Sequence, residues 1–258
     1  MPKASSLRLA LGYLFTPGRG ALEARRPENL RPSLLLYLAA SAASLLFWTL
    51  IPRAFPAPSG ALGSGAFSLP LASRALSSLW TAALELAGAG LTAAFALYLK
   101  SGRPAPAAAR NLIAAAAATA PLILLLASYA PRSGSLPVLP VLGLAAGAGI
   151  WLLRRGTSEW RPPLAFLLGL NAASFILLPA LAAAFWVGSE KLYQGAEIAG
   201  GLWILWATAR GLGALAEIKM PRAFLSIVLA LIAQISLALA FNRLGLLPVP
   251  LLKAVMYE

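Results

Sequence analysis

The chain has 258 residues, of which 60% are hydrophobic and only 11% are charged. A soluble domain carries about 25% charged residues, so this composition indicates an integral membrane protein. The sequence contains no Cys, His or Asp, which excludes disulfides, His- or thiolate-ligated metal sites, Ser–His hydrolases and aspartyl proteases. We therefore expect no metal, no cofactor and no enzymatic activity.

The first 31 residues are basic and only weakly apolar, which is not the pattern of a signal peptide. Leu7–Phe15 has the pattern of a short interfacial amphipathic helix. Thr16 and Pro17 then predict a second helix start, and Pro27 its end. The arginines expected to face anionic lipid headgroups are Arg8, Arg19, Arg25, Arg26 and Arg31.

Seven apolar segments follow, each a candidate transmembrane helix. They are Pro32–Pro52, Ala75–Leu99, Leu112–Ala130, Leu136–Leu153, Pro163–Val187, Ile198–Ala216 and Ala223–Phe241. The fourth is short and opens with two prolines, so it is either a span or a re-entrant segment, and six spans is the alternative. The predicted fold is an all-α polytopic bundle over residues 32–241, between a basic segment (1–31) and a tail (242–258).

The cations divide unequally between the two faces of this topology. With seven spans, 15 of the 21 Lys and Arg residues fall on one face and six on the other. The positive-inside rule then predicts a cytoplasmic N-terminus and an outside C-terminus. This pattern explains the net charge of +13 without a nucleic-acid partner.

Four polar residues are predicted near the bilayer midplane. At 1.5 Å per residue, Glu85 lies about 15 Å and Arg210 about 18 Å from the starts of their helices, and Asn171 and Gln234 fall at similar depths. Because a lone charge in lipid is costly, we expect Glu85 and Arg210 to pair. The cluster could form a transport pathway or only fix helix order, and the structural role is the more common one.

Two prolines lie inside predicted helices, Pro121 in the third segment and Pro179 in the fifth. A proline in a helix interior removes a backbone hydrogen bond and clashes with the preceding turn. We therefore expect a kink at each position.

Four stretches, in order along the chain, share features with one family of membrane proteins. They are Leu14–Pro17 with the later Pro32, Tyr98–Arg103, Ala115–Leu122, and Gly201–Leu212 followed by Pro221. Together they resemble the bacterial Yip1-type integral membrane proteins, although Ala replaces the family's Gly-Tyr pair in the third stretch. Eukaryotic relatives bind Rab GTPases in vesicle traffic, so the resemblance implies an adaptor or membrane-organising role and supplies no catalytic residue.

These sequence features are compatible with two alternative functions. The first is a non-enzymatic, Yip1-like adaptor or trafficking-type factor in a bacterial inner membrane, contacting anionic lipid headgroups and either a membrane-protein partner or a second copy of the chain. The alternative is a small transporter, lipid-handling protein or permease subunit that uses Glu85 and Arg210. A water-accessible path to Glu85 would favour transport, and a sealed pair would favour the adaptor.

Overall fold

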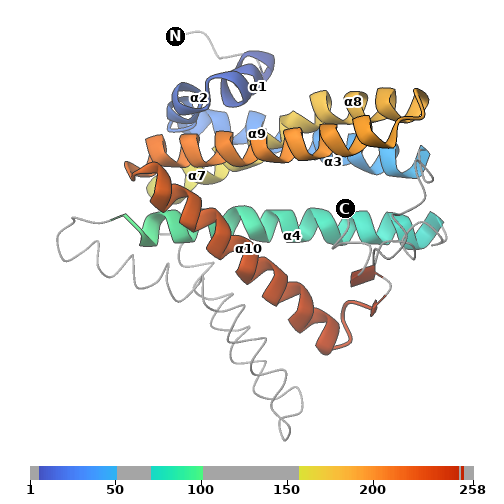
Figure 1. Ribbon diagram of the computed structural model, residues 1–258. Coiled ribbons are helices and arrows are strands. Elements are labelled where there is room, and N and C mark those ends of the chain that lie inside the picture. The colour runs from blue at the N-terminus through green and yellow to red at the C-terminus, as the bar shows by residue number, and fades with distance from the viewer. Residues whose placement is uncertain (1–5, 51–70, 101–156, 250, 253–258) are drawn as a thin grey trace, which may run out of the picture.

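The computed structural model describes residues 6–50, 71–100, 157–249, 251 and 252 (Figure 1). Within these ranges every long regular element is a helix. The elements are α1 (Ser6–Phe15), α2 (Pro17–Glu23), η1 (Pro27–Asn29), α3 (Leu30–Leu50), α4 (Leu71–Tyr98), α7 (Thr157–Leu170), η3 (Asn171–Ala173), α8 (Ser174–Trp186), α9 (Glu190–Ala216) and α10 (Met220–Arg243). The predicted all-α class is therefore confirmed for the described part of the chain.

Within the described residues, five helical stretches are long and apolar enough to cross a membrane, as expected for an integral membrane protein. They are Pro27–Phe47, Leu79–Tyr98, Trp160–Trp186, Glu190–Ala216 and Met220–Arg243. Each corresponds to one of the seven predicted segments. The other two segments, 112–130 and 136–153, lie outside the described residues together with Pro121.

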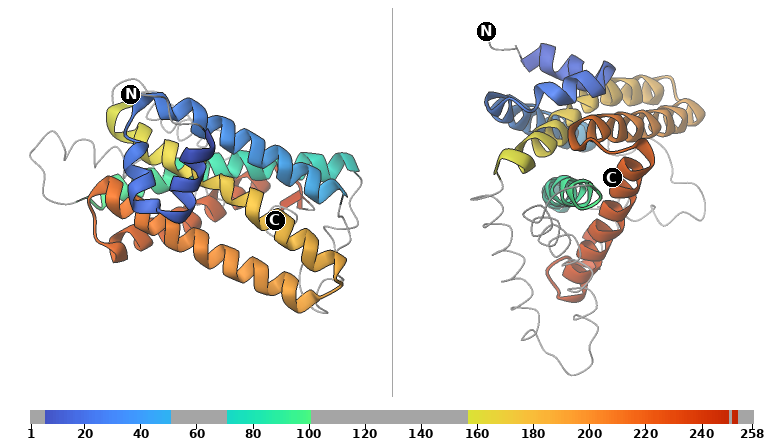
Figure 2. Two further views of the ribbon diagram at one scale, coloured as in Figure 1. Left: turned by 90° about the horizontal axis from the view of Figure 1, so that it is seen from above. Right: turned by 90° about the vertical axis from the view of Figure 1, so that its left-hand side faces the viewer.

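The helices form layers (Figures 1 and 2). α3, α7–α8 and α9 run side by side, and α1 and α2 lie across one face of this layer. α4 lies on the opposite face, and α10 crosses α4 obliquely. The start of α7 and the ends of α4 and α9 share one end of the bundle, where Lys100 contacts Glu217.

The N-terminal segment packs into the bundle. The backbones of α1 and α2 touch at Gly12 and Gly20, where a Cβ on Gly20 would overlap the Gly12 carbonyl. Tyr13 is fully buried, and its ring meets Phe166 of α7 edge-on at 5.4 Å and 85°. Residues of the predicted basic segment thus contribute to the same core as the spanning helices.

α1 carries apolar side chains on two sides. Leu9, Tyr13 and Leu14 face the core, whereas Leu7 and Leu11 are exposed together with Phe15. One side docks onto α7 and α9, which leaves the second apolar side uncovered by the described residues.

The span from Trp160 to Trp186 is not one continuous α-helix. It passes through the 3₁₀ turn η3 at Asn171–Ala173, which tightens the backbone between α7 and α8. Pro179 lies inside α8, as the sequence predicts. The 3₁₀ turn η3 lies about two helical turns before Pro179.

α9 begins and ends with local signals. Ser189 caps its start by accepting a hydrogen bond from the Leu192 N–H at 3.3 Å. At its end Glu217 adopts the left-handed conformation, with φ 56°, and the Ile218 N–H bonds back to the Gly213 carbonyl at 3.1 Å. This is the Schellman arrangement, in which glycine is the usual left-handed residue.

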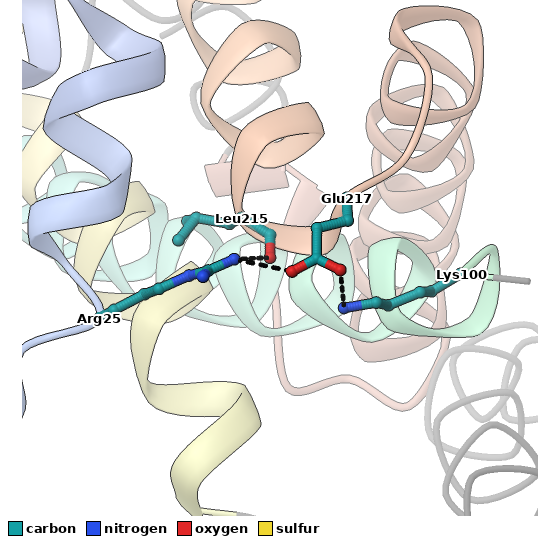
Figure 3. A network of polar contacts seen from close by, with 4 residues as sticks. All are labelled: Arg25, Lys100, Leu215 and Glu217. Atoms are coloured by element: carbon teal, nitrogen blue, oxygen red, sulfur yellow. Dashed lines mark hydrogen bonds and ion pairs between the residues drawn. The ribbon is translucent and has the colours of Figure 1, made fainter. Parts of the chain in front are cut away.

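Glu217 also joins three segments at this end of the bundle (Figure 3). Arg25, just after α2, donates to the Glu217 carboxylate at 3.0 Å and to the Leu215 carbonyl at 3.3 Å. The Lys100 Nζ, just after α4, lies 3.7 Å from the other carboxylate oxygen. One carboxylate therefore connects the N-terminal segment, α4 and the α9–α10 turn.

Candidate functional site

A cavity of about 440 Å³ lies between α3, α4, η3–α8 and α9. We call it the polar cavity. Its lining is partly apolar, but it also holds two carboxyls, four hydroxyls and one amide. These polar residues are Ser41, Ser44, Thr81, Glu85, Asn171, Ser174 and Glu197.

Glu85 reaches this cavity from the middle of α4. It lies about 14 residues from Leu71 and 13 from Tyr98, that is, about 20 Å from either end of the helix. Its side chain is exposed rather than packed under neighbouring helices. A carboxyl at mid-depth in a spanning helix is a functional candidate, because such a group is costly in hydrocarbon.

α3 fits against α4 beside the cavity through a specific hydrogen bond. The buried Tyr37 hydroxyl donates to the Ala82 carbonyl on α4 at 2.6 Å. This contact holds Ala40 and Ser41 on α3 opposite Ala82 and Glu85, so one wall of the cavity is fixed by the packing of the two helices.

Asn171 enters the cavity at the 3₁₀ turn between α7 and α8. Its Nδ2 donates to the Leu167 carbonyl one turn earlier, at 3.3 Å. The following residue in the wall, Ser174, begins α8. A break in a spanning helix is tolerated where its polar groups line a cavity, which is the situation here.

Glu197 supplies the second carboxyl, from the first half of α9. α8 and α9 approach closely near this point, because a Cβ on Gly200 would lie 2.6 Å from Cδ1 of Leu177. Gly201, the next residue, lines the cavity itself. Small residues on α9 thus let α8 carry Ser174 and Leu178 near Glu197.

The electrostatic character of the cavity is acidic. The described residues that line it include two glutamates and no Lys or Arg. Carboxylate, hydroxyl and amide oxygens favour hard cations, protons and protonated amines. Among the described residues there is no group of three or more His, Cys, Asp or Glu side chains that could hold a metal ion.

The structure separates the four residues predicted to cluster. Glu85 and Asn171 line the polar cavity together. Arg210 instead lines a different cavity beside α2, and Gln234 lies against α4 at Gly88, where an added Cβ would come within 2.5 Å of the Gln234 Oε1.

The predicted pairing of Glu85 with Arg210 is therefore corrected. Equal depth was the reason for expecting it, but depth says nothing of the face of the helix on which a side chain lies. α4 packs mainly against α10 and α7, whereas the face of α9 that carries Arg210 is turned toward α2.

The five predicted lipid-facing arginines have different surroundings. Arg25 pairs with Glu217 at 3.0 Å, and Arg26 with Glu23 at 3.2 Å. Arg8, Arg19 and Arg31 are exposed. Arg25 and Arg26 thus make contacts within the protein.

Glu197 is the residue that the sequence pattern missed. The predicted span began at Ile198 because the preceding residues are polar, but α9 begins at Glu190. Ser189 followed by Glu190 is a helix-start signal, and it would have placed Glu197 inside the helix.

Comparison with family models, with curated proteins and with solved structures finds no match to this chain.

Proposed function

We propose that the protein is a small membrane carrier that moves a cation, the proton included, through the polar cavity. Glu85 is the central binding group, Asn171 and the hydroxyls are neutral oxygen donors, and Glu197 is a second acidic group along the path. The observation that carries this proposal is the 440 Å³ cavity among four spanning elements, whose described lining includes Glu85 and Glu197 and no Lys or Arg.

The depth of the groups supports this function. Glu85 lies at mid-length of α4 and Asn171 near the middle of the Trp160–Trp186 span, whereas Glu197 is about seven residues from the start of α9. At 1.5 Å per residue, Glu197 is about 10 Å from that end. The two carboxyls thus lie at different depths, with Glu197 nearer one end of the bundle and Glu85 nearer its centre.

The test is flux through the purified full-length chain in liposomes, with pH and cation gradients imposed separately. Glu85→Gln removes the charge and keeps the size, so we expect cation flux to fall at least about tenfold. Glu197→Gln should reduce flux less. Glu190→Gln is the matched control, because Glu190 is on the same helix but outside the cavity and bonds to Gln194 at 3.0 Å.

Flux that is unchanged in Glu85→Gln, or no flux above empty liposomes for any cation tested, would contradict the carrier proposal. The Yip1-like adaptor would then be the remaining proposal, supported by the sequence resemblance and by the basic end of the bundle. There Arg25, Arg26 and Arg161 line a separate cavity of about 230 Å³.

A cytoplasmic N-terminus in a bacterial inner membrane remains part of this proposal. Its support is the gathering of cations at one end of the bundle. Arg25, Arg31, Lys100, Arg161 and Lys219 belong to segments that begin or end there.

A further inference from the structure

A second cavity, of about 680 Å³, opens between the N-terminal helices and the α9–α10 turn. We call it the basic groove. Phe15 and Arg19 come from the N-terminal side, Trp206 and Arg210 from α9, and Lys219 and Met220 from the turn and the start of α10. The groove lies apart from the polar cavity, and no residue lines both.

The groove concentrates positive charge from three separate segments. Among the described residues, its lining holds Arg19, Arg210 and Lys219 and no carboxylate. No ion pair within the described residues involves any of these three side chains. Arg210 lies over the start of α2, since a Cβ on Gly18 would be 3.8 Å from the Arg210 Nε. Three convergent cations of this kind select an anion with several oxygens, such as a phosphate.

The other half of the lining is apolar and aromatic. Phe15 packs on Trp203 with ring centroids 5.8 Å apart, and Trp206, Ile218 and Met220 complete the surface. A site for a freely soluble phosphate has no need of this much apolar surface. A phosphate attached to an apolar molecule matches both halves of the groove.

An exposed apolar stripe leads away from the groove along α9. Ile198, Leu202 and Trp206 are 64%, 62% and 48% exposed and follow one another at intervals of four residues, with Arg210 next. Residues four apart share a face of a helix. The stripe spans about 12 Å from Ile198 to Trp206, so an acyl chain lying on it would end at Arg210.

The depth of Arg210 fits a lipid headgroup. Arg210 is six residues before the end of α9, or about 9 Å along a helix about 40 Å long. A hydrocarbon core about 30 Å thick therefore ends near this level, and the long arginine side chain extends toward the headgroups.

We propose that the basic groove binds one anionic glycerophospholipid, with its phosphate between Arg19, Arg210 and Lys219 and an acyl chain along the α9 stripe. This lipid joins the N-terminal helices to the α9–α10 turn. The inference does not rest on the carrier proposal, because it concerns a different cavity.

The test is lipid titration of the purified full-length chain in detergent, followed by native mass spectrometry. Phosphatidylglycerol and phosphatidylcholine of equal chain length are the probes. We expect the wild type to prefer phosphatidylglycerol, and Arg210→Gln to reduce that preference about tenfold, because a charge-assisted hydrogen bond is lost. Arg210→Lys should keep most of it.

Arg31→Gln is the matched control. It removes one exposed cation near the same end of the bundle but outside the groove. Equal losses in Arg31→Gln and Arg210→Gln would overturn the proposal, because they would indicate diffuse attraction to a basic surface. A normal elution profile in size-exclusion chromatography identifies variants that are folded.

Glycerol 3-phosphate and inorganic phosphate separate a lipid from a soluble ligand. We expect neither to displace phosphatidylglycerol at millimolar concentration. If either binds the wild type as tightly as the lipid does, the groove is a site for a soluble phosphate and the lipid assignment is wrong.

Discussion

Tyr13 is fully buried between α1 and α7, where its hydroxyl shares a hydrogen bond of 3.1 Å with the Ser33 side chain. Burial raises the pKa of Tyr13 from 10.0 to about 12; the Ser33 hydrogen bond lowers it, and the charge of Glu23 raises it further. The folded state therefore favours the neutral, protonated side chain of Tyr13. Ser33 is itself completely buried, so the pair depends on both partners.

The pKa shift predicts a pH dependence of stability. The unfolded chain ionises Tyr13 near pH 10, and the folded chain holds the proton until about pH 12. Below pH 10 the stabilisation is complete, and it is lost as the pH rises from 10 to 12. The difference between a pKa of 10 in the unfolded chain and of about 12 in the folded chain corresponds to at most about 2.7 kcal/mol of folding free energy.

Tyr13→Phe isolates this contribution. At pH 7 we expect the variant to be less stable by about 1 kcal/mol, because Ser33 is left without its partner. Above pH 10 the difference from the wild type should shrink, since the variant has no phenol to ionise. Thermal unfolding in detergent from pH 7 to 12 measures this, and a difference that is constant with pH would contradict it.

Counting residues along a helix gave the depth of Glu85 and Asn171, and the structure brings these two together. Residue counting could not predict the neighbours of Arg210, because those depend on how α2 docks onto α9. α2 is only seven residues long, and its position follows from contacts such as Gly12 with Gly20 that have no periodic signal in the sequence.

At the scale of elements, the turn after α9 combines two opposing effects in one residue. Glu217 is the one non-glycine residue with positive φ in the described part of the chain, and this conformation costs about 1 kcal/mol for a residue with a Cβ. Its carboxylate in return contacts Arg25 and Lys100. The side chain of Glu217 is 61% exposed, so these contacts contribute at most about 1 kcal/mol.

Substitutions at Glu217 separate the two effects. Glu217→Ala loses the ion pairs and keeps the backbone strain, whereas Glu217→Gly loses the pairs and removes the strain. We expect the glycine variant to be more stable than the alanine variant by about 1 kcal/mol, measured by thermal unfolding in detergent. Glu217→Gln should cost less than about 1 kcal/mol. An alanine variant as stable as the glycine variant would mean that the turn is not left-handed in solution.

The boundaries of α9 show which part of an element the sequence can predict. Apolar periodicity identified its second half, from Ile198, but the polar residues between Glu190 and Glu197 hid the first two turns. The cap at Ser189 marks the true start. Hydropathy alone underestimates a spanning helix whose first turns carry the polar lining of a cavity.

At the scale of the whole molecule, the five described spans alternate in direction. α3 and α7 begin, and α4 and α9 end, at the same end of the bundle (Figures 1 and 2). Arg31 and Lys191 therefore belong to opposite ends.

This alternation supports a topology that thiol labelling can test. The chain contains no cysteine, so a single introduced cysteine is the only reactive thiol. Lys191→Cys, at the exposed start of α9, and Glu258→Cys, at the C-terminus, should react with a membrane-impermeant maleimide in intact cells that express the chain. Arg31→Cys, exposed at the start of α3, should react only after the membrane is permeabilised, as the predicted cytoplasmic N-terminus requires. The reverse pattern would invert the orientation. Labelling of Arg31→Cys and Lys191→Cys from the same side would contradict the alternation of the spans itself.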